Sequence, residues 1–369
     1  MNIELELKKE GIEVVDKIDT LKVNSLAKSI SIKICTTFPE YNLNQNELFI
    51  KLCRLNMYKA KMPTEISEAS YFYKNTSIYI NKDISDEDLE EFIVHECIHY
   101  LQEVRDNKNN LVRMGFCNFK HNKEAGLGLN ESSVQLIASK INGIPKEFVK
   151  YYGISFKTIS PSYYPLQCCL TNQLAYLIGE DVLFKSTLFS TNTFEQSLSN
   201  IISPKLYISI LNSLTELLNL EQEIALLNKQ ILNFDNRNNK VTNMFKKIDE
   251  LKNEISLTFF KTQNLIITSY FNNSFLKILN LEDLENYRRK LYNFKNLIGT
   301  QNGYTYFDTY CTQKMNELED KHILLESGYD LSQSSLYLAP VKSTIFSKIL
   351  NAIKSLLKIK TNPKEIKSI

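Results

Sequence analysis

Apolar side chains recur at helical spacing along much of the chain, and the clearest run lies in its second half. Its members, three or four residues apart, are Leu217, Leu220, Ile224, Leu227, Ile231 and Phe234. After a polar segment, residues 235–240, the spacing resumes with Met244, Ile248, Leu251 and Ile255. The pattern predicts two long helices in an antiparallel hairpin, similar to a coiled coil. A core-facing stripe of an ordinary helical domain has the same spacing, so both interpretations stay open.

Shorter apolar stripes predict further helices. They span 21–34, a segment from Asn44 or Asn46 to just before Pro63, 166–184, 281–297 and 307–327. Alternating apolar residues predict a short strand or an irregular arm around residues 3–7, and two strands, at 71–73 and 77–80, on either side of a turn. The expected fold class is therefore α+β and mostly helical, with a small antiparallel sheet.

One predicted helix carries the most specific chemical signal, a His-Glu-x-x-His motif that runs from His95 to His99. Residues four apart lie one turn above each other, so the two imidazoles can point at the same place with Glu96 beside them. Two neutral imidazoles and a third protein ligand leave a zinc ion one open position for water, and a neighbouring carboxylate can take the water's proton. Ser85 is the predicted N-cap, with Asp88 three residues on. Two histidines with a purely structural role are the alternative.

The third ligand has three candidates further along the chain. A histidine six residues beyond His99 with a glycine three residues before it would indicate a metzincin, but those positions hold Arg105 and Gln102. The candidates that remain are His121, Glu124 and Glu131. Glycines ahead of Glu131 predict a turn, and Asn130 or a neighbour can cap a helix that starts there. Its carboxylate, on the first turn of a second helix, is well placed to meet the two imidazoles.

These residues resemble those of the gluzincin zinc metallopeptidases, which pair His-Glu-x-x-His with a downstream Glu on a second helix, often as Asn-Glu. The resemblance covers roughly residues 65–185 and is specific only at the metal motif. It implies that His95, His99 and Glu131 bind Zn²⁺ and that Glu96 is the general base. Gln135, one turn after Glu131, stands where some members place an Asp that orients a ligand histidine.

The resemblance also implies a zincin-like fold and a strand before the metal helix that binds the backbone of a peptide at the edge of the sheet. A plain structural hairpin is the alternative for residues 71–80. A zinc peptidase needs a donor for the developing oxyanion, which Tyr163 or Tyr164 can supply. We select Tyr164, although a chain with 20 tyrosines makes a structural role the competing interpretation.

Composition adds few constraints. The net charge of +2 does not favour nucleic acid as a partner. The seven cysteines have no CxxC spacing and are expected to be reduced thiols. Residues 1–19 lack the apolar core of a signal peptide and no apolar run has the length of a membrane span, so we expect a cytoplasmic protein.

The sequence thus predicts a zincin-like metallohydrolase domain over residues 1–200, a helical hairpin domain over 201–335 and a basic amphipathic segment over 336–369. The basic segment can bind a membrane surface or a partner protein, or dock on the chain itself. The predicted function is zinc-dependent hydrolysis of a peptide or protein substrate. The alternative is a zincin-fold scaffold with little or no turnover that binds a partner through its helical hairpin.

Overall fold

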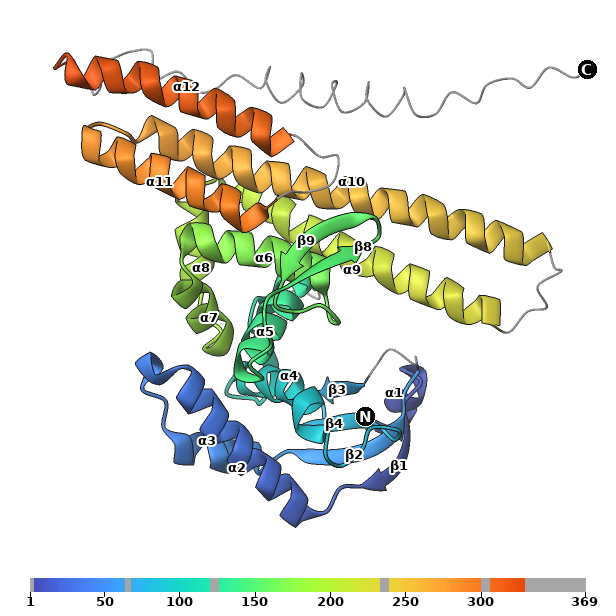
Figure 1. The fold of residues 1–369 in the computed structure, drawn as a ribbon. Helices are drawn as coiled ribbons and strands as arrows, with labels where there is room; N and C mark the ends of the chain where they lie inside the picture. The colour runs from blue at the N-terminus through green and yellow to red at the C-terminus, as the bar shows by residue number, and fades with distance from the viewer. Residues whose placement is uncertain (1–2, 64–67, 120–125, 233–238, 300–305, 329–369) are drawn as a thin grey trace, which may run out of the picture.

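The computed structural model describes residues 3–63, 68–119, 126–232, 239–299 and 306–328, and helices dominate it (Figure 1). The α-helices are α1 (Ile3–Lys9), α2 (Thr20–Thr37), α3 (Gln45–Leu52), α4 (Leu89–Leu101), α5 (Leu127–Ile141), α6 (Pro165–Ile178), α7 (Glu180–Leu188), α8 (Thr193–Ser199), α9 (Pro204–Leu232), α10 (Asn239–Leu276), α11 (Leu281–Ile298) and α12 (Tyr306–Glu326). The strands are β1 (Glu13–Lys17), β2 (Asn56–Lys61), β3 (Ala69–Phe72), β4 (Ser77–Asn81), β5 (Glu103–Arg105), β6 (Leu111–Met114), β7 (Cys117–Asn118), β8 (Glu147–Tyr151) and β9 (Ile154–Thr158).

The largest sheet has the strand order β1-β2-β4-β3. Strands β2 and β4 are parallel, whereas the other two pairs are antiparallel. The antiparallel hairpin predicted at 71–73 and 77–80 is confirmed by β3 and β4, but the prediction of an antiparallel sheet was wrong because β2, which was missed, pairs in parallel with β4. The residues of β2 had been assigned to a helix that runs up to Pro63, but α3 ends at Leu52, and Met57 and Ala60 are then fully buried on opposite faces of a strand.

Both faces of this sheet are covered. Ile78 and Ile80 of β4 join the main core with α2 and α4, while Tyr79 between them packs on the other face against Leu7 and Ile12. This alternation is the period of two that a strand imposes. The strand or irregular arm expected around residues 3–7 is instead helix α1, with acidic residues in its first turn and lysines in its last, and it covers this second face with Leu7.

Helix α5 connects the N-terminal part to the helical half of the chain (Figure 1). It packs on α4 on one side and on α9 on the other. It begins at Leu127, earlier than the predicted start near Asn130, so Gly128 is helical and does not form a turn. A Cβ at Gly128 would overlap the backbone of Leu214, and the Gly128 N–H donates to Thr215 Oγ1 at 3.2 Å. The glycine is needed for this close helix contact.

Helices α9 and α10 confirm the two long helices of the predicted hairpin, and they run antiparallel side by side (Figure 1). The apolar stripe of α9 also faces the common core, since Leu217, Leu220 and Ile224 belong to one buried cluster that extends from Val23 to Leu318. The predicted division at residue 200 stays a prediction.

The other helices follow the predicted spans with one break. The segment 166–184 is divided into α6 and α7 at Gly179, whose φ of 127° no ordinary helix residue adopts. Helices α11 and α12 occupy the segments predicted at 281–297 and 307–327. The basic segment 336–369 lies outside the described residues. Within the described part of the chain, none of the helices has both the length and the apolar character that crossing a membrane requires.

Replacing Gly128 by Ala tests the contact between α5 and α9. The added methyl has no room against the α9 backbone, so we expect a loss of about 1–3 kcal/mol in the free energy of unfolding, even though Ala is the better helix former. Denaturant unfolding measures it. Asn253→Ala, at an exposed position of α10, is the control and should change stability by less than about 0.5 kcal/mol. A Gly128→Ala protein as stable as the control would contradict the close approach.

Candidate metal centre

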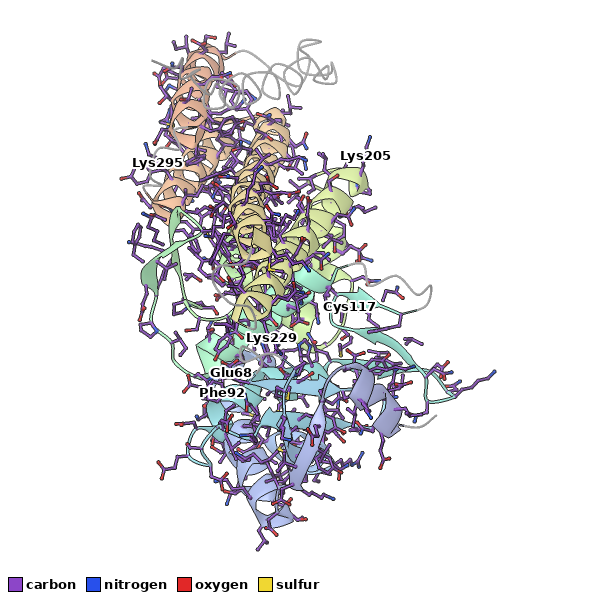
Figure 2. The ribbon with its side chains drawn as sticks, turned by 90° about the vertical axis from the view of Figure 1, so that its right-hand side faces the viewer. Glu68, Phe92, Cys117, Lys205, Lys229 and Lys295 are labelled. Carbon is purple, nitrogen blue, oxygen red and sulfur yellow. The ribbon has the colours of Figure 1, made fainter. Side chains whose placement is uncertain are left out.

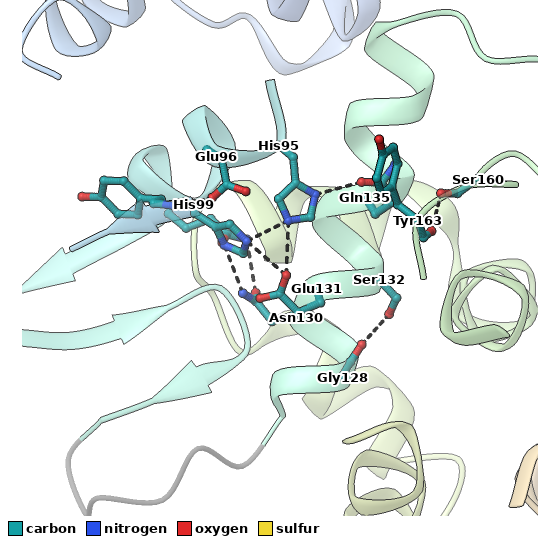
Figure 3. Close-up of polar contacts among 12 residues, drawn as sticks. His95, Glu96, His99, Gly128, Asn130, Glu131, Ser132, Gln135, Ser160 and Tyr163 are labelled. Carbon is teal, nitrogen blue, oxygen red and sulfur yellow. Dashed lines mark hydrogen bonds and ion pairs between the residues drawn. The ribbon is translucent and has the colours of Figure 1, made fainter. Parts of the chain in front are cut away.

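Helix α4 carries the two histidines on the face opposite its core contacts. Ile93, Val94 and Ile98 are fully buried and pack into the main core, which leaves His95 and His99 directed at α5 (Figure 3). Ser85 Oγ accepts from the Asp88 N–H at 3.2 Å and donates to the Asp88 carboxylate at 2.7 Å. The helix begins only at Leu89, with Asp88 as its N-cap, so the prediction of Ser85 as the N-cap was wrong and Ser85 instead stabilises the turn before the helix.

Three side-chain atoms from α4 and α5 converge on one point. His95 Nε2 lies 3.0 Å from His99 Nε2, and Glu131 Oε2 lies 3.2 Å from the first nitrogen and 3.4 Å from the second. Ligands about 2.0–2.1 Å from a tetrahedral ion are about 3.3 Å apart. The exposed fractions of the three side chains are only 12%, 6% and 15%. The cluster can therefore hold a metal ion.

The hydrogen bonds of His95 fix which of its nitrogens is free to bind a cation. Its Nδ1 lies 2.9 Å from Gln135 Oε1, and Gln135 Nε2 donates to Ser139 Oγ at 3.2 Å. An amide oxygen can only accept, so the Nδ1 of His95 carries the proton and its Nε2 presents a lone pair. Gln135 thus orients the ring through its amide oxygen.

His99 is held in the same tautomer by Gln102. The Gln102 amide donates to the backbone carbonyl of Thr187 at 2.9 Å and to Asn130 Oδ1 at 3.3 Å, so its oxygen faces His99 Nδ1 at 3.3 Å. Asn130 is fully buried, and its Oδ1 also accepts from the Phe116 N–H at 3.1 Å. Its Nδ2 lies 3.5 Å from His99 Nδ1, beyond a good hydrogen bond.

The role of Gln102 was not predicted from the sequence. The available signal was its position three residues after His99, on the same face of the helix. Asn130 was expected to cap α5, but it supports Gln102 instead. The turn between β6 and β7 lies close to Asn130 and Gln102. A Cβ at Gly115 in this turn would overlap both side chains, so this position requires a glycine.

The electrostatics of the cluster favour a bound positive charge. Burial lowers the pKa of His99, but the nearby Glu131 carboxylate outweighs burial and raises this pKa to about 9. Burial likewise raises the pKa of Glu131, yet His99 and His95 hold it well below its usual range. Two ring nitrogens and an ionised carboxylate face each other, and either a proton on His99 or a metal ion supplies the missing positive charge.

Glu96 lies beside the cluster without joining it (Figure 3). Its Oε2 accepts a hydrogen bond of 2.7 Å from the Tyr71 backbone N–H of strand β3. Because Tyr71 is paired with Ile78 of β4 only on its other side, this bond uses the free edge of β3. The carboxylate is thereby fixed between the metal cluster and the edge of the sheet.

The two candidate tyrosines face different groups. The Tyr164 ring lies 5.9 Å from the His95 ring, and burial followed by the charges of Glu131 and Glu96 raises the pKa of Tyr164. Burial and then Glu68 raise the pKa of Tyr163, and neither Glu131 nor Glu96 is among the causes. Tyr164 also has left-handed backbone angles, φ 49° and ψ 41°, which cost a non-glycine residue about 1–2 kcal/mol.

A cavity of about 710 Å³ opens next to the cluster. His95, Glu96 and Tyr164 line one part of it, and α9 forms another wall. Figure 2 labels Glu68 and Phe92, which line this cavity, and Lys229 near the C-terminal end of α9. The Lys229 ammonium donates to the carbonyl of Pro63. The alternative ligands His121 and Glu124 lie outside the described residues.

No protein-family model matches the chain, and neither a curated protein nor a solved structure matches it.

Removing a ligand tests the metal centre. The purified protein should contain about one divalent ion per chain, measured by elemental analysis after dialysis, and Glu131→Gln or His95→Ala should reduce this to background. Glu96→Gln is the matched control, since Glu96 is adjacent to the cluster but outside it, and should retain the ion. Equal metal content in all four proteins would contradict the assignment.

The hydrogen bond to His95 should be measurable as metal affinity. Gln135→Leu removes the acceptor that holds the ring, and the dissociation constant should rise about 10–100-fold, measured by competition with a chromophoric chelator. Gln135→Glu keeps an acceptor at the same place and should bind at least as tightly as the wild type. If leucine and glutamate behaved alike, the Gln135 carbonyl would have no role in orienting His95.

Proposed function

We propose that the protein is a zinc-dependent, metallopeptidase-like hydrolase. The observation that carries this proposal is the meeting of His95 Nε2, His99 Nε2 and Glu131 Oε2 within 3.4 Å of one another, beside a cavity that His95 and Glu96 line. Three ligands and one open side are typical of catalytic zinc sites, whereas structural sites are closed by four protein ligands.

The donor set favours zinc. Imidazole suits several transition metals, but two neutral imidazoles and one carboxylate in a compact, near-tetrahedral arrangement are typical of zinc. A bound zinc ion supplies Lewis-acid chemistry, which lowers the pKa of water and polarises a carbonyl. His95, His99 and Glu131 would hold it, and Gln135 and Gln102 would keep the rings in the required tautomer.

Glu96 is the general base in this proposal. The Tyr71 N–H holds one of its oxygens at 2.7 Å, so the other is available to take the proton of the attacking water. The same carboxyl group then delivers the proton to the leaving amine. The phenol of Tyr164, on the other side of His95, is the donor for the developing oxyanion.

Strand β3 supports a peptide as the substrate. It is the edge strand of its sheet, and Ala69 and the preceding Glu68 line the cavity. An extended peptide that adds to this edge would place its backbone beside Glu96, which already contacts the edge at Tyr71.

The alternative function is a scaffold that binds a partner through the α9–α10 hairpin. Two large apolar side chains near its tip favour this alternative: Leu232 is 77% exposed and Phe245 is 53% exposed. The Glu96→Gln experiment below discriminates the two functions, because a scaffold would show no hydrolysis to lose.

Glu96→Gln should abolish hydrolysis and leave metal binding intact. Loss of a general base lowers the rate by about 10²–10⁴-fold, measured as peptide cleavage by mass spectrometry on a mixed peptide pool. Glu90→Gln, on the same helix but outside the cavity lining, is the control and should keep most of the activity. Activity in Glu96→Gln equal to that of the wild type would remove Glu96 from the mechanism.

Tyr164→Phe should lower kcat by about 10²–10³-fold with little change in KM, because an oxyanion donor acts only in the transition state. Tyr163→Phe, which removes the neighbouring phenol directed at Glu68, should lower kcat far less. Equal effects of the two substitutions would assign the oxyanion role to neither.

A further inference from the structure

The charged side chains that line the cavity are nearly all of one sign. Those described are Glu10, Glu68, Glu91, Glu96 and Glu221, together with the imidazole of His95. No lysine or arginine is among the described lining residues, although Lys229 lies at the margin and bonds to Pro63. Clefts lined by a single sign of charge concentrate ligands of the opposite sign.

Glu221 differs from the other four carboxylates because it is withdrawn from solvent and incompletely bonded. It belongs to α9, whereas Glu96, which lines the same cavity, belongs to α4. Its Oε2 accepts from Gln167 Nε2 at 2.5 Å, whereas its Oε1 is buried without a hydrogen-bond partner. Gln167 is itself fully buried, and its Oε1 is also unpartnered. A buried carboxylate oxygen without a donor is costly unless a ligand supplies one.

The surroundings of Glu221 suit a cation with an apolar stem. Tyr151 and Tyr152 line the same part of the cavity, with ring centroids 4.3 Å apart, and Leu218 and Ile224 of α9 lie on either side of Glu221 along the helix. Aromatic faces attract ammonium and guanidinium groups and also cover the methylene chain that carries them.

We propose that Glu221 determines substrate specificity by binding a cationic group of the substrate, an ammonium or guanidinium. The cation donates to the free Oε1 of Glu221 and packs against Tyr151 and Tyr152 while the peptide lies along β3. This inference rests on the proposed hydrolase function for its substrate, but the cation site itself is defined by Glu221, Gln167 and the tyrosine pair.

The protonation of Glu221 agrees with this role. Burial raises the pKa of Glu221 to about 7, although Gln167, which donates to its Oε2, and the nearby Tyr151 hydroxyl lower this pKa. The titratable groups that face it are Tyr151 and Tyr152 from the β8–β9 hairpin and Cys168 from α6; burial raises the pKa of each, so all three are neutral near pH 7. On α10, Lys247 pairs with Glu223 instead.

The test compares peptides in which one position is fixed as arginine or as citrulline, its neutral near-isostere. Binding of the fluorescein-labelled pools to the zinc-loaded Glu96→Gln protein is followed by fluorescence anisotropy, and cleavage by the wild-type protein by mass spectrometry. At one position the arginine pool should bind about 10–100-fold more tightly, the range expected for a charge-assisted hydrogen bond. Pools with a free or an acetylated amino terminus show whether a terminal ammonium can take the same place.

Glu221→Gln is the decisive variant, and Glu223→Gln is its matched control. Both replace a carboxylate on α9 by an amide, but Glu223 lies outside the cavity lining and pairs with Lys247 at 3.7 Å. The preference for arginine over citrulline should vanish in the first variant and persist in the second. In the wild type this preference should increase from pH 6 to pH 8, because the carboxyl ionises as the pH rises through about 7. A merely structural Glu221 would not produce that profile.

The outcomes separate this inference from the proposed function. Equal binding and cleavage of arginine and citrulline pools at every position would overturn the cation site while leaving a hydrolase intact. A preference for arginine that Glu221→Gln removes, in a protein that cleaves no peptide, would support the cation site and reject the peptidase function. The arginine and citrulline pools are compared on proteins that retain Glu221. The result of this comparison therefore holds even if the Glu221→Gln protein folds poorly.

Discussion

Three hydrogen-bond acceptors that face one another inside the protein are the central constraint of this structure. The Nε2 atoms of His95 and His99 and the carboxylate of Glu131 face one point, at separations of 3.0–3.4 Å. Such an arrangement is unfavourable when it is buried without positive charge. The side-chain amides of Gln135 and Gln102 accept hydrogen bonds from the Nδ1 atoms, so the Nε2 lone pairs of both rings are free to bind a cation.

The fold positions this cluster by bringing together segments that are far apart along the chain. Helix α4 packs on the sheet and supplies both histidines, whereas α5 supplies the carboxylate and is held against α9 through Gly128. Glu96 is fixed by the free edge of β3. The same α9 that supports α5 also forms the acidic wall that carries Glu221. The proposed metal ligands, base and specificity residue therefore come from three helices, α4, α5 and α9.

The local part of this site could be predicted from the sequence, and the long-range part could not. His95, Glu96 and His99 lie within one helical turn, and Asn130-Glu131 stands out as a pair before an apolar stripe. Gln102, by contrast, depends on the carbonyl of Thr187, 85 residues away along the chain, and Gly128 on α9, 87 residues away. From the sequence alone, Gly128 predicts a turn. Only its close contact with α9 explains why a glycine lies inside helix α5. Strand β2 was missed for a related reason, because its pairing with β4 overrides a local pattern compatible with a helix.

X-ray absorption spectroscopy of the zinc-loaded protein tests the central claim most directly. The account predicts a first shell of nitrogen and oxygen at about 2.0–2.1 Å, with the outer-shell scattering of two imidazoles, and no sulfur. In Glu131→Gln the zinc signal should be lost or its first shell changed. A sulfur shell at about 2.3 Å, or a spectrum without imidazole scattering, would place the ion among other residues and contradict the account.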